Sequence, residues 1–164
     1  QQDKTPIPYE IVVLLSGPEP QRSMLEHKFV NYLRDNLFPS LIVRGIPSKK
    51  PKIMKIGNID LVPHINTQEM QRIILNAPTL FCRSGYSTLM DLMTLGKKAV
   101  LVPTPGQTEQ EYLAKKFKIE GIAPSCKQEN FKFTELDKIQ LYRGFEMPDI
   151  VQDWEQLFSL FQGK

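Results

Sequence analysis

The sequence has few of the residues on which several classes of protein depend. Its two cysteines, Cys82 and Cys126, lie far apart and offer neither the spacing of a metal site nor the density of a disulfide framework. We therefore expect two free thiols and a reducing compartment. No apolar run approaches the roughly 20 residues of a membrane-spanning helix, and no signal peptide is visible. These shortages predict a soluble, cytoplasmic protein.

A large excess of one charge is lacking as well. The 21 Lys and Arg residues and the 18 Asp and Glu residues give a net charge of only +3. That excess is too small to indicate a nucleic-acid partner, so we expect none. The lysine clusters at residues 49–52 and 115–116 are expected to be solvated, and a weak preference for anionic ligands or a membrane surface stays open.

Several common motifs fail on spacing. A hydrolase nucleophile elbow at residues 85–89 would need glycine where the chain has Leu89. A P-loop ending at residues 96–98 would need glycine in place of Asp91 and a hydroxyl residue in place of Lys98. No Gly-x-Gly-x-x-Gly follows the first predicted strand, and no Asp-x-Asp pair is present. We therefore expect no dinucleotide cofactor and no divalent-metal mechanism.

The sequence does alternate strands with helices from end to end. An apolar run at residues 11–15 predicts a buried strand, and the helix after it should carry one apolar stripe, formed by Met24, Leu25, Phe29 and Leu33. The other predicted strands are 41–43, 59–62, 79–82, 99–102 and a short one near 122. A second predicted helix begins at residue 66 or 67. The remaining predicted helices cover residues 86–95, 110–118, 134–142 and 149–161. This order predicts one compact α/β domain with a Rossmann-like, doubly wound parallel sheet of about six strands, and with ligands at the carboxyl ends of those strands.

The most informative segment joins the predicted strand at residues 79–82 to the following helix. Ser84 and Gly85 form a small polar turn that lets a ligand approach the backbone, and the first N–H groups of a helix attract anions. Ser87 and Thr88 add hydroxyls in the first turn of that helix. Asp91 lies one turn further along the same face, where its carboxylate could accept hydrogen bonds from a vicinal diol. Phosphate and ribose together indicate a nucleotide.

Two more turns follow predicted strands and should lie at the same edge. The first contains Gly17 and ends with Arg22, whose guanidinium could pair with a phosphate. The second places Gln107, Gln110 and Glu111 at the start of a helix. Taken singly, the three turns are as well explained by an exposed arginine, a capped helix and a charged loop. Their joint occurrence favours a nucleotide site.

The same residues resemble a known family signature. The run from Cys82 through Asp91, then Gly96, the Val102-Pro103 pair and the Gln110-Glu111 pair, is similar to the donor site of GT-B glycosyltransferases, in their C-terminal half. Within that class the chain resembles glycosyltransferase family 28, and in particular the lipid-intermediate N-acetylglucosaminyltransferases of peptidoglycan synthesis. The resemblance covers about residues 11–114.

The resemblance implies a role for most of these residues. Ser87 and Thr88 would lie beside the diphosphate of a UDP-sugar, Asp91 would hold the ribose hydroxyls, and the backbone at Ile65 would read uracil. Gln110 and Glu111 would face the donor sugar, and the resemblance implies a preference for N-acetylglucosamine. Arg22 would approach the phosphates.

The chain departs from the family pattern in three places. Pro18 and Pro20 replace glycine and serine in the first turn and remove two N–H donors. Asp91 stands where the family usually has the longer glutamate. Glu111 replaces the second glutamine of the usual pair, which changes a donor into an anion and leaves the identity of the sugar open.

The resemblance also implies the mechanism and the missing partner. Transfer would proceed with inversion, with the charge of the leaving UDP stabilised by a helix N-terminus, hydroxyls and an arginine instead of a metal. Neither His27 nor His64 is assigned as the base, which should come from the other half of such an enzyme. We expect residues 1–8 to be a linker remnant and residues 9–164 to be one nucleotide-sugar-binding domain without its acceptor-binding N-terminal half.

Two alternatives stay open beside an excised domain. The chain could be a natural single-domain subunit that needs a partner, or half of a UDP-sugar 2-epimerase. Whether it is an excised domain or a natural single-domain subunit, the isolated chain should bind its donor but transfer nothing. Any membrane contact would be peripheral and made through the missing half.

Overall fold

The computed structural model describes residues 5–50 and 52–147, and its centre is a six-stranded sheet. The strands are β1 (Ile11–Leu14), β2 (Ser40–Val43), β3 (Met54–Ile56), β4 (Ile59–Val62), β5 (Thr79–Cys82) and β6 (Val100–Leu101). They lie in the order β3-β4-β2-β1-β5-β6, and every pairing is parallel except that of β3 with β4. The predicted doubly wound sheet of about six strands is therefore confirmed.

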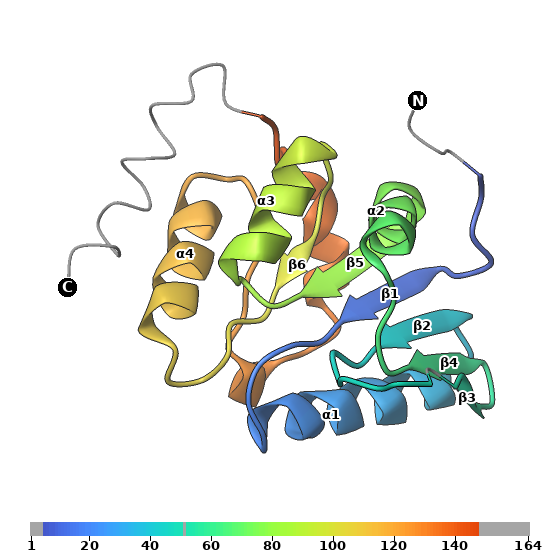
Figure 1. The fold of residues 1–164 in the computed structure, drawn as a ribbon. Helices are drawn as coiled ribbons and strands as arrows, with labels where there is room; N and C mark the ends of the chain where they lie inside the picture. Colours follow the sequence, from blue (N-terminus) through green and yellow to red (C-terminus); the bar gives the residue numbers. More distant parts are fainter. Residues whose placement is uncertain (1–4, 51, 148–164) are drawn as a thin grey trace.

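Helices cover both faces of this sheet (Figure 1). The α-helices are α1 (Gln21–Asn36), α2 (Thr67–Asn76), α3 (Tyr86–Thr94), α4 (Thr108–Ile119) and α5 (Glu135–Lys138), and the short 3-10 turns are η1 (Gln128–Asn130) and η2 (Ile139–Leu141). Buried side chains of α2, α3 and α4 pack on one face, and those of α1 and η2 pack on the other. This two-sided cover explains why the parallel strands are mostly apolar in sequence.

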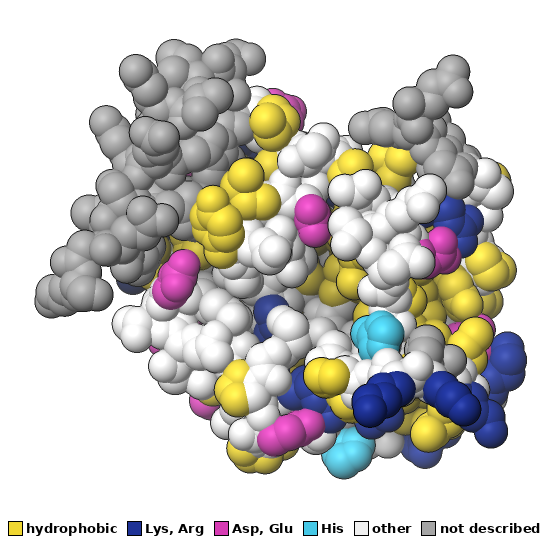
Figure 2. Space-filling view, in the orientation of Figure 1, with side chains coloured by type: hydrophobic (Ala, Val, Ile, Leu, Met, Phe, Trp, Pro, Cys, Tyr) yellow, Lys and Arg dark blue, Asp and Glu magenta, His cyan; other side chains and the backbone are white. Residues whose placement is uncertain are grey.

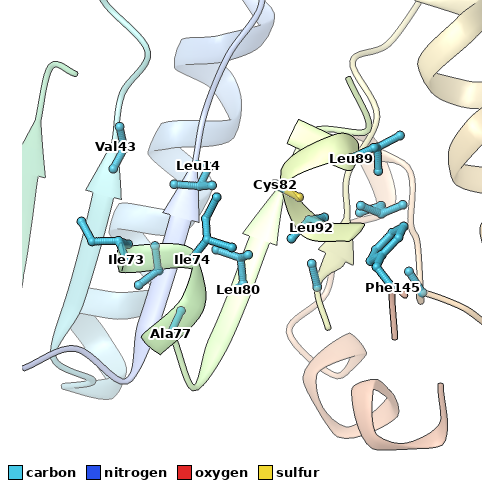
Figure 3. Close-up of a cluster of buried hydrophobic side chains, with 14 of the residues drawn as sticks. Leu14, Val43, Ile73, Ile74, Ala77, Leu80, Cys82, Leu89, Leu92 and Phe145 are labelled. Atoms are coloured by element: carbon cyan, nitrogen blue, oxygen red, sulfur yellow. The ribbon is translucent and has the colours of Figure 1, made fainter. Parts of the chain in front are cut away.

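Two apolar clusters form the core, one on each face of the sheet. In β1, Val12 and Leu14 belong to the cluster beneath α2, α3 and α4, whereas Ile11 and Val13 belong to the cluster above α1. This alternation follows from the two-residue repeat of a strand. Figure 3 shows the first cluster, in which side chains from three strands meet those of α2 and α3.

The stripe predicted for α1 is correct except at Met24. Leu25, Phe29 and Leu33 are buried at helical spacing, but the side chain of Met24 is 49% exposed. Met24 lies about 100° around the helix from Leu25, so it faces away from the sheet. Two charged residues of the helix, Arg22 and Glu26, are buried as well, which the apolar pattern could not reveal.

Three predictions about smaller elements need correction or fall outside the described residues. No strand forms near residue 122, because only a single bridge, between Leu101 and Ser125, continues the sheet there. The helix predicted at residues 134–142 is split into α5 and η2. The strand β3 was not predicted, since it is short and exposed and pairs only through a tight hairpin. The helix predicted at 149–161 lies outside the described residues.

Both Cys82 and Cys126 are free thiols, as predicted, and burial raises the pKa of each to about 12. Within the described part of the chain, none of the helices has the length and apolar character needed to cross a bilayer.

Candidate functional site

The candidate site lies where the strand order reverses. Chain connections from β1 lead towards β2, whereas those from β5 lead towards β6 on the other side, so the loops after β1 and β5 diverge. Ligands of doubly wound sheets bind in the crevice that this divergence opens at the carboxyl ends of the strands. The loops after β1, β5 and β6 carry the three turns singled out in the sequence. Figure 2 shows a hollow in the face of the molecule on which these loops lie.

Backbone donors at the start of α3 form the first part of the site. Gly85 precedes the helix in an extended conformation, with φ −75° and ψ 149°, and no side chain caps the helix. The amides of Ser87 and Thr88, in the first turn, therefore have no partner within the helix, which is the arrangement that attracts an anion. Ser87, which is exposed, and Thr88, which is half-buried, add hydroxyls in the same turn.

Asp91 supplies an acceptor one turn along α3. Its carboxylate is half-buried and accepts no hydrogen bond from any residue that the structure describes. Burial raises the pKa of Asp91 above its usual range because no cation offsets the loss of water. A buried carboxylate without a donor is suited to accept hydrogen bonds from ligand hydroxyls.

Gln110 joins two of the three loops. Its side-chain oxygen accepts a hydrogen bond from the Thr104 amide at 2.9 Å, and its side-chain nitrogen donates to Gln107 at 2.6 Å. Its backbone carbonyl accepts a hydrogen bond from the buried Ser84 hydroxyl at 2.7 Å. The loop after β5 is thereby fixed to the start of α4, and Gln107, Gln110 and Ser84 are brought together.

Glu111 and Gly17 lie at the borders of this group. The carboxylate of Glu111 accepts a hydrogen bond from the Gly106 amide at 3.3 Å and is exposed. Gly17 has a φ of +96°, and a Cβ placed there would lie 3.3 Å from the Thr104 hydroxyl. The loop after β1 therefore passes close to the loop after β6, with little room for a side chain at Gly17.

Arg22 is engaged elsewhere on its own helix and the turn before it. Its guanidinium is buried and donates to Glu26 at 2.6 Å and to Glu19 at 2.7 Å. Glu26 also accepts two hydrogen bonds from Arg44 at 2.9 Å. Contact between Arg22 and a phosphate stays a prediction, and it would require these ion pairs to rearrange.

The loop between β4 and α2 places backbone groups near the same edge. Ile65 is half-buried against the cluster beneath α2, and its backbone N–H and C=O bond to no residue that the structure describes. His64 holds this loop to the loop after β2, because its Nε2 lies 2.6 Å from the Ser48 carbonyl oxygen. A half-buried strand end with an unused amide and carbonyl could read the edge of a base.

Three further residues beneath the site carried no predicted role. Arg83 is 1% exposed and donates to the carbonyls of Val102, Pro103 and Gln21 and to the side chain of Gln128. The Thr104 hydroxyl is buried without a partner among the described residues. Of these three residues, only Arg83 could have been singled out from the sequence, because it is an arginine directly after an apolar strand. Nothing in the sequence distinguishes Thr104 or Gln128 from ordinary loop residues.

Within residues 5–50 and 52–147, no three His, Cys, Asp or Glu side chains are grouped closely enough to hold a metal ion.

Comparison with known sequences identifies a family for this arrangement. The family described as glycosyltransferase family 28 C-terminal domain matches residues 48–148, which include α3, Asp91 and Gln110. The chain is 35% identical over 91 residues to a UDP-N-acetylglucosamine–N-acetylmuramyl-(pentapeptide) pyrophosphoryl-undecaprenol N-acetylglucosamine transferase of Desulforudis audaxviator. It is 27% identical over 99 residues to the protein of the same name from Caldanaerobacter subterraneus. Each match covers 54% of this chain but only 22% and 27% of the respective relatives.

Comparison with solved structures supports the fold. The chain matches MurG of Acinetobacter baumannii with a TM-score of 0.58 and 22% identity, over 98% of this chain and 51% of that one. It matches ALG13 with a TM-score of 0.59 and 15% identity, over 91% of this chain and 94% of that one. The glycosyltransferase of kitacinnamycin is matched with a TM-score of 0.60 and 15% identity, over 99% of this chain and 41% of that one. The predicted GT-B fold is therefore confirmed.

Proposed function

Because the chain belongs to glycosyltransferase family 28, as a C-terminal domain of that family, we propose that it binds the UDP-sugar donor of an inverting glycosyltransferase. The observation that carries this proposal is the pairing of an uncapped helix start at Gly85 with an unpartnered carboxylate at Asp91, one turn along the same helix. Phosphates prefer the first of these positions, and a ribose diol suits the second.

The nucleotide would lie across the loops after β1, β4 and β5. The diphosphate would accept hydrogen bonds from the amides of α3 and from the Ser87 and Thr88 hydroxyls, with Gly17 and Ser84–Gly85 keeping the approach open. Asp91 would hold the ribose, and the free amide and carbonyl of Ile65 would read uracil. Arg22 would join the phosphates only after leaving its carboxylate partners, which makes it the weakest member of this set.

The sugar would face the start of α4. Gln107, Gln110 and Glu111 offer amide and carboxylate groups there, and Gln110 is already held in place by Thr104 and Gln107. We propose N-acetylglucosamine as the sugar, because the two sequence relatives are named as transferases of that sugar. Glu111 replaces the second glutamine of the usual pair, so any difference in sugar specificity from other family members would arise at this residue.

Inversion requires attack by an acceptor from the side opposite to the leaving UDP. This chain's part is to bind the donor, orient the bond that breaks and stabilise the charge that develops on the diphosphate, through the amides and hydroxyls of α3. We assign neither a divalent cation nor a catalytic base to this chain. An acceptor-binding domain or partner would supply the base, so the isolated chain should bind UDP but transfer nothing.

A single-domain subunit that works with a partner chain is the second candidate. It is favoured by one observation: the match to ALG13 extends over 94% of that solved chain, so a domain of this size exists as a chain of its own. The donor site is the same in both candidates. They differ in whether the acceptor-binding part is joined to this chain or separate from it.

Calorimetric titration tests the donor site directly. The chain would be titrated with UDP, UDP-N-acetylglucosamine and ADP, first without metal and then with magnesium. We expect the uridine ligands to bind without metal, ADP to bind far more weakly, and Asp91→Ala to weaken UDP binding by about 1–3 kcal/mol through loss of a charged hydrogen bond. Equal binding of ADP and UDP, or an Asp91→Ala variant that binds as tightly as the original chain, would contradict the proposal.

A further inference from the structure

A buried positive charge without a carboxylate partner lies beneath the candidate site. The guanidinium of Arg83 donates four hydrogen bonds, at 3.1 Å to Val102, 3.2 Å to Pro103, 3.2 Å to Gln21 and 2.7 Å to Gln128. All four acceptors are neutral oxygens. Its remaining nitrogen, Nε, is buried and bonds to none of the described residues.

The other buried arginine of the described chain shows how such a charge is usually accommodated. Arg22 is 4% exposed, but it is paired with Glu19 and Glu26. No carboxylate among the described residues pairs with Arg83. Burial lowers the pKa of Arg83 to about 10, so the guanidinium is still protonated at neutral pH. The fold therefore retains a buried cation whose charge is left uncompensated.

The position of this charge relates it to the three loops. Arg83 directly follows β5 and comes two residues before Gly85, which precedes α3. Its acceptors lie at the end of β6, at the start of α1 and in η1, so one side chain fixes the loops after β1, β5 and β6 to each other. Because Arg83 is buried, its charge acts through a region of low dielectric and can reach an anion bound at these loops over several ångströms.

We propose that Arg83 is a positioning residue of the donor site, and that its uncompensated charge attracts the diphosphate of the ligand without touching it. The proposal rests on the proposed function, since it deepens the account of how that site holds its phosphates. It assigns the positive potential of the site to a buried arginine, in addition to the helix start and the exposed hydroxyls.

The test compares UDP with uridine, which lacks the phosphates. The ratio of the dissociation constant for uridine to that for UDP measures what the phosphates add to affinity. In Gln128→Glu, a carboxylate would replace the amide that accepts from Arg83, keep that hydrogen bond and neutralise the charge. We expect this variant to lower that ratio about tenfold, with the affinity for uridine unchanged. Gln128→Met, which adds no charge, is the matched control and should leave the ratio as it is.

Variants of Arg83 separate its charge from its hydrogen bonds. Arg83→Lys keeps the charge but cannot reproduce four hydrogen bonds, so we expect lower thermal stability and an almost unchanged ratio. Arg83→Met removes both, and the ratio should fall about tenfold. If Arg83→Met fails to fold, Gln128→Glu still decides the matter.

The outcomes distinguish this inference from the proposed function. If the unaltered chain binds UDP no better than uridine, the proposed function fails and this inference fails with it. If it binds UDP more tightly but Gln128→Glu leaves the ratio unchanged, only the inference is overturned. A scaffold role alone would lower UDP and uridine affinity equally in Arg83→Met and so leave the ratio unchanged, and that result would also overturn the inference.

Discussion

The carboxylate of Asp91 is half-buried on α3, and no described residue donates a hydrogen bond to it. Burial raises its pKa, so the folded chain disfavours the charged form. For a group of this kind, the contribution to stability is fully present below the ordinary pKa of 3.8 and is lost as the pH rises through the raised value. At neutral pH, Asp91 therefore destabilises the unliganded fold, which is typical of a residue kept for binding.

Asp91→Asn should separate these two effects. Asparagine has nearly the same shape and no charge, so we expect the thermal midpoint of the unliganded chain at pH 7 to stay the same or rise. UDP affinity should fall about tenfold, because a neutral amide oxygen accepts hydrogen bonds more weakly. Differential scanning calorimetry and titration of the same sample would measure both, with Asp137→Asn on the exposed face of α5 as control. A variant that loses stability and keeps its affinity would contradict the assignment.

At the scale of elements, the loop after β2 fits tightly against the end of β1. Gly45 has a φ of +68°, and a Cβ there would lie 2.3 Å from the carbonyl oxygen of Leu15. Gly57, in the hairpin between β3 and β4, has a similar φ of +57° but no atom within 4 Å of such a Cβ. The two glycines share a backbone conformation and differ only in their surroundings.

Replacing each of these two glycines with alanine would measure how tightly the loop after β2 fits against the end of β1. Gly57→Ala should cost about 1–2 kcal/mol of unfolding free energy, the usual penalty for a left-handed alanine. Gly45→Ala carries the same penalty plus a backbone clash, so we expect at least about 2 kcal/mol more. Urea unfolding of both variants would measure the difference. Equal losses would mean that the loop after β2 moves freely away from β1.

At the scale of the whole molecule, Glu26 joins α1 to the end of β2. Burial alone would raise the pKa of its carboxyl, but hydrogen bonds from Arg44 and Arg22 outweigh burial and hold the pKa below the ordinary 4.5. The stability that comes from a depressed pKa is fully present above 4.5 and is lost as the pH falls through the depressed value.

Removing this carboxylate should change both stability and its pH dependence. In Glu26→Gln, two guanidinium groups lose their shared anion, so we expect a loss of about 3–5 kcal/mol at pH 7. The decline in stability below pH 4.5 should also become shallower than in the unaltered chain. Urea unfolding at several pH values would measure this, and Glu129→Gln at an exposed position is the control. Parallel pH profiles for Glu26→Gln and the unaltered chain would contradict this account.

The elements that formed as predicted are those with strong local patterns. Five of the strands are parallel, mostly buried and mostly apolar, and α2 follows Asn66, one of the two starting residues predicted, whose side chain caps the Glu69 amide at 2.8 Å. The elements that were missed or misread have weak local patterns. β3 consists of three residues that pair only with β4, and α5 has only four residues before η2 begins.

The sequence by itself determined most of the order of strands and helices, the turn that opens α3 and the residue types at the candidate site, because these depend on patterns a few residues long. Only the tertiary structure decided that Arg22 is bound by Glu19 and Glu26, and that Arg83 lies buried without a carboxylate. Those contacts join residues through space, and Arg83 meets Gln128 across 45 positions of the chain. Whether a charged side chain is neutralised depends on what the fold brings next to it, and no local pattern carries that information.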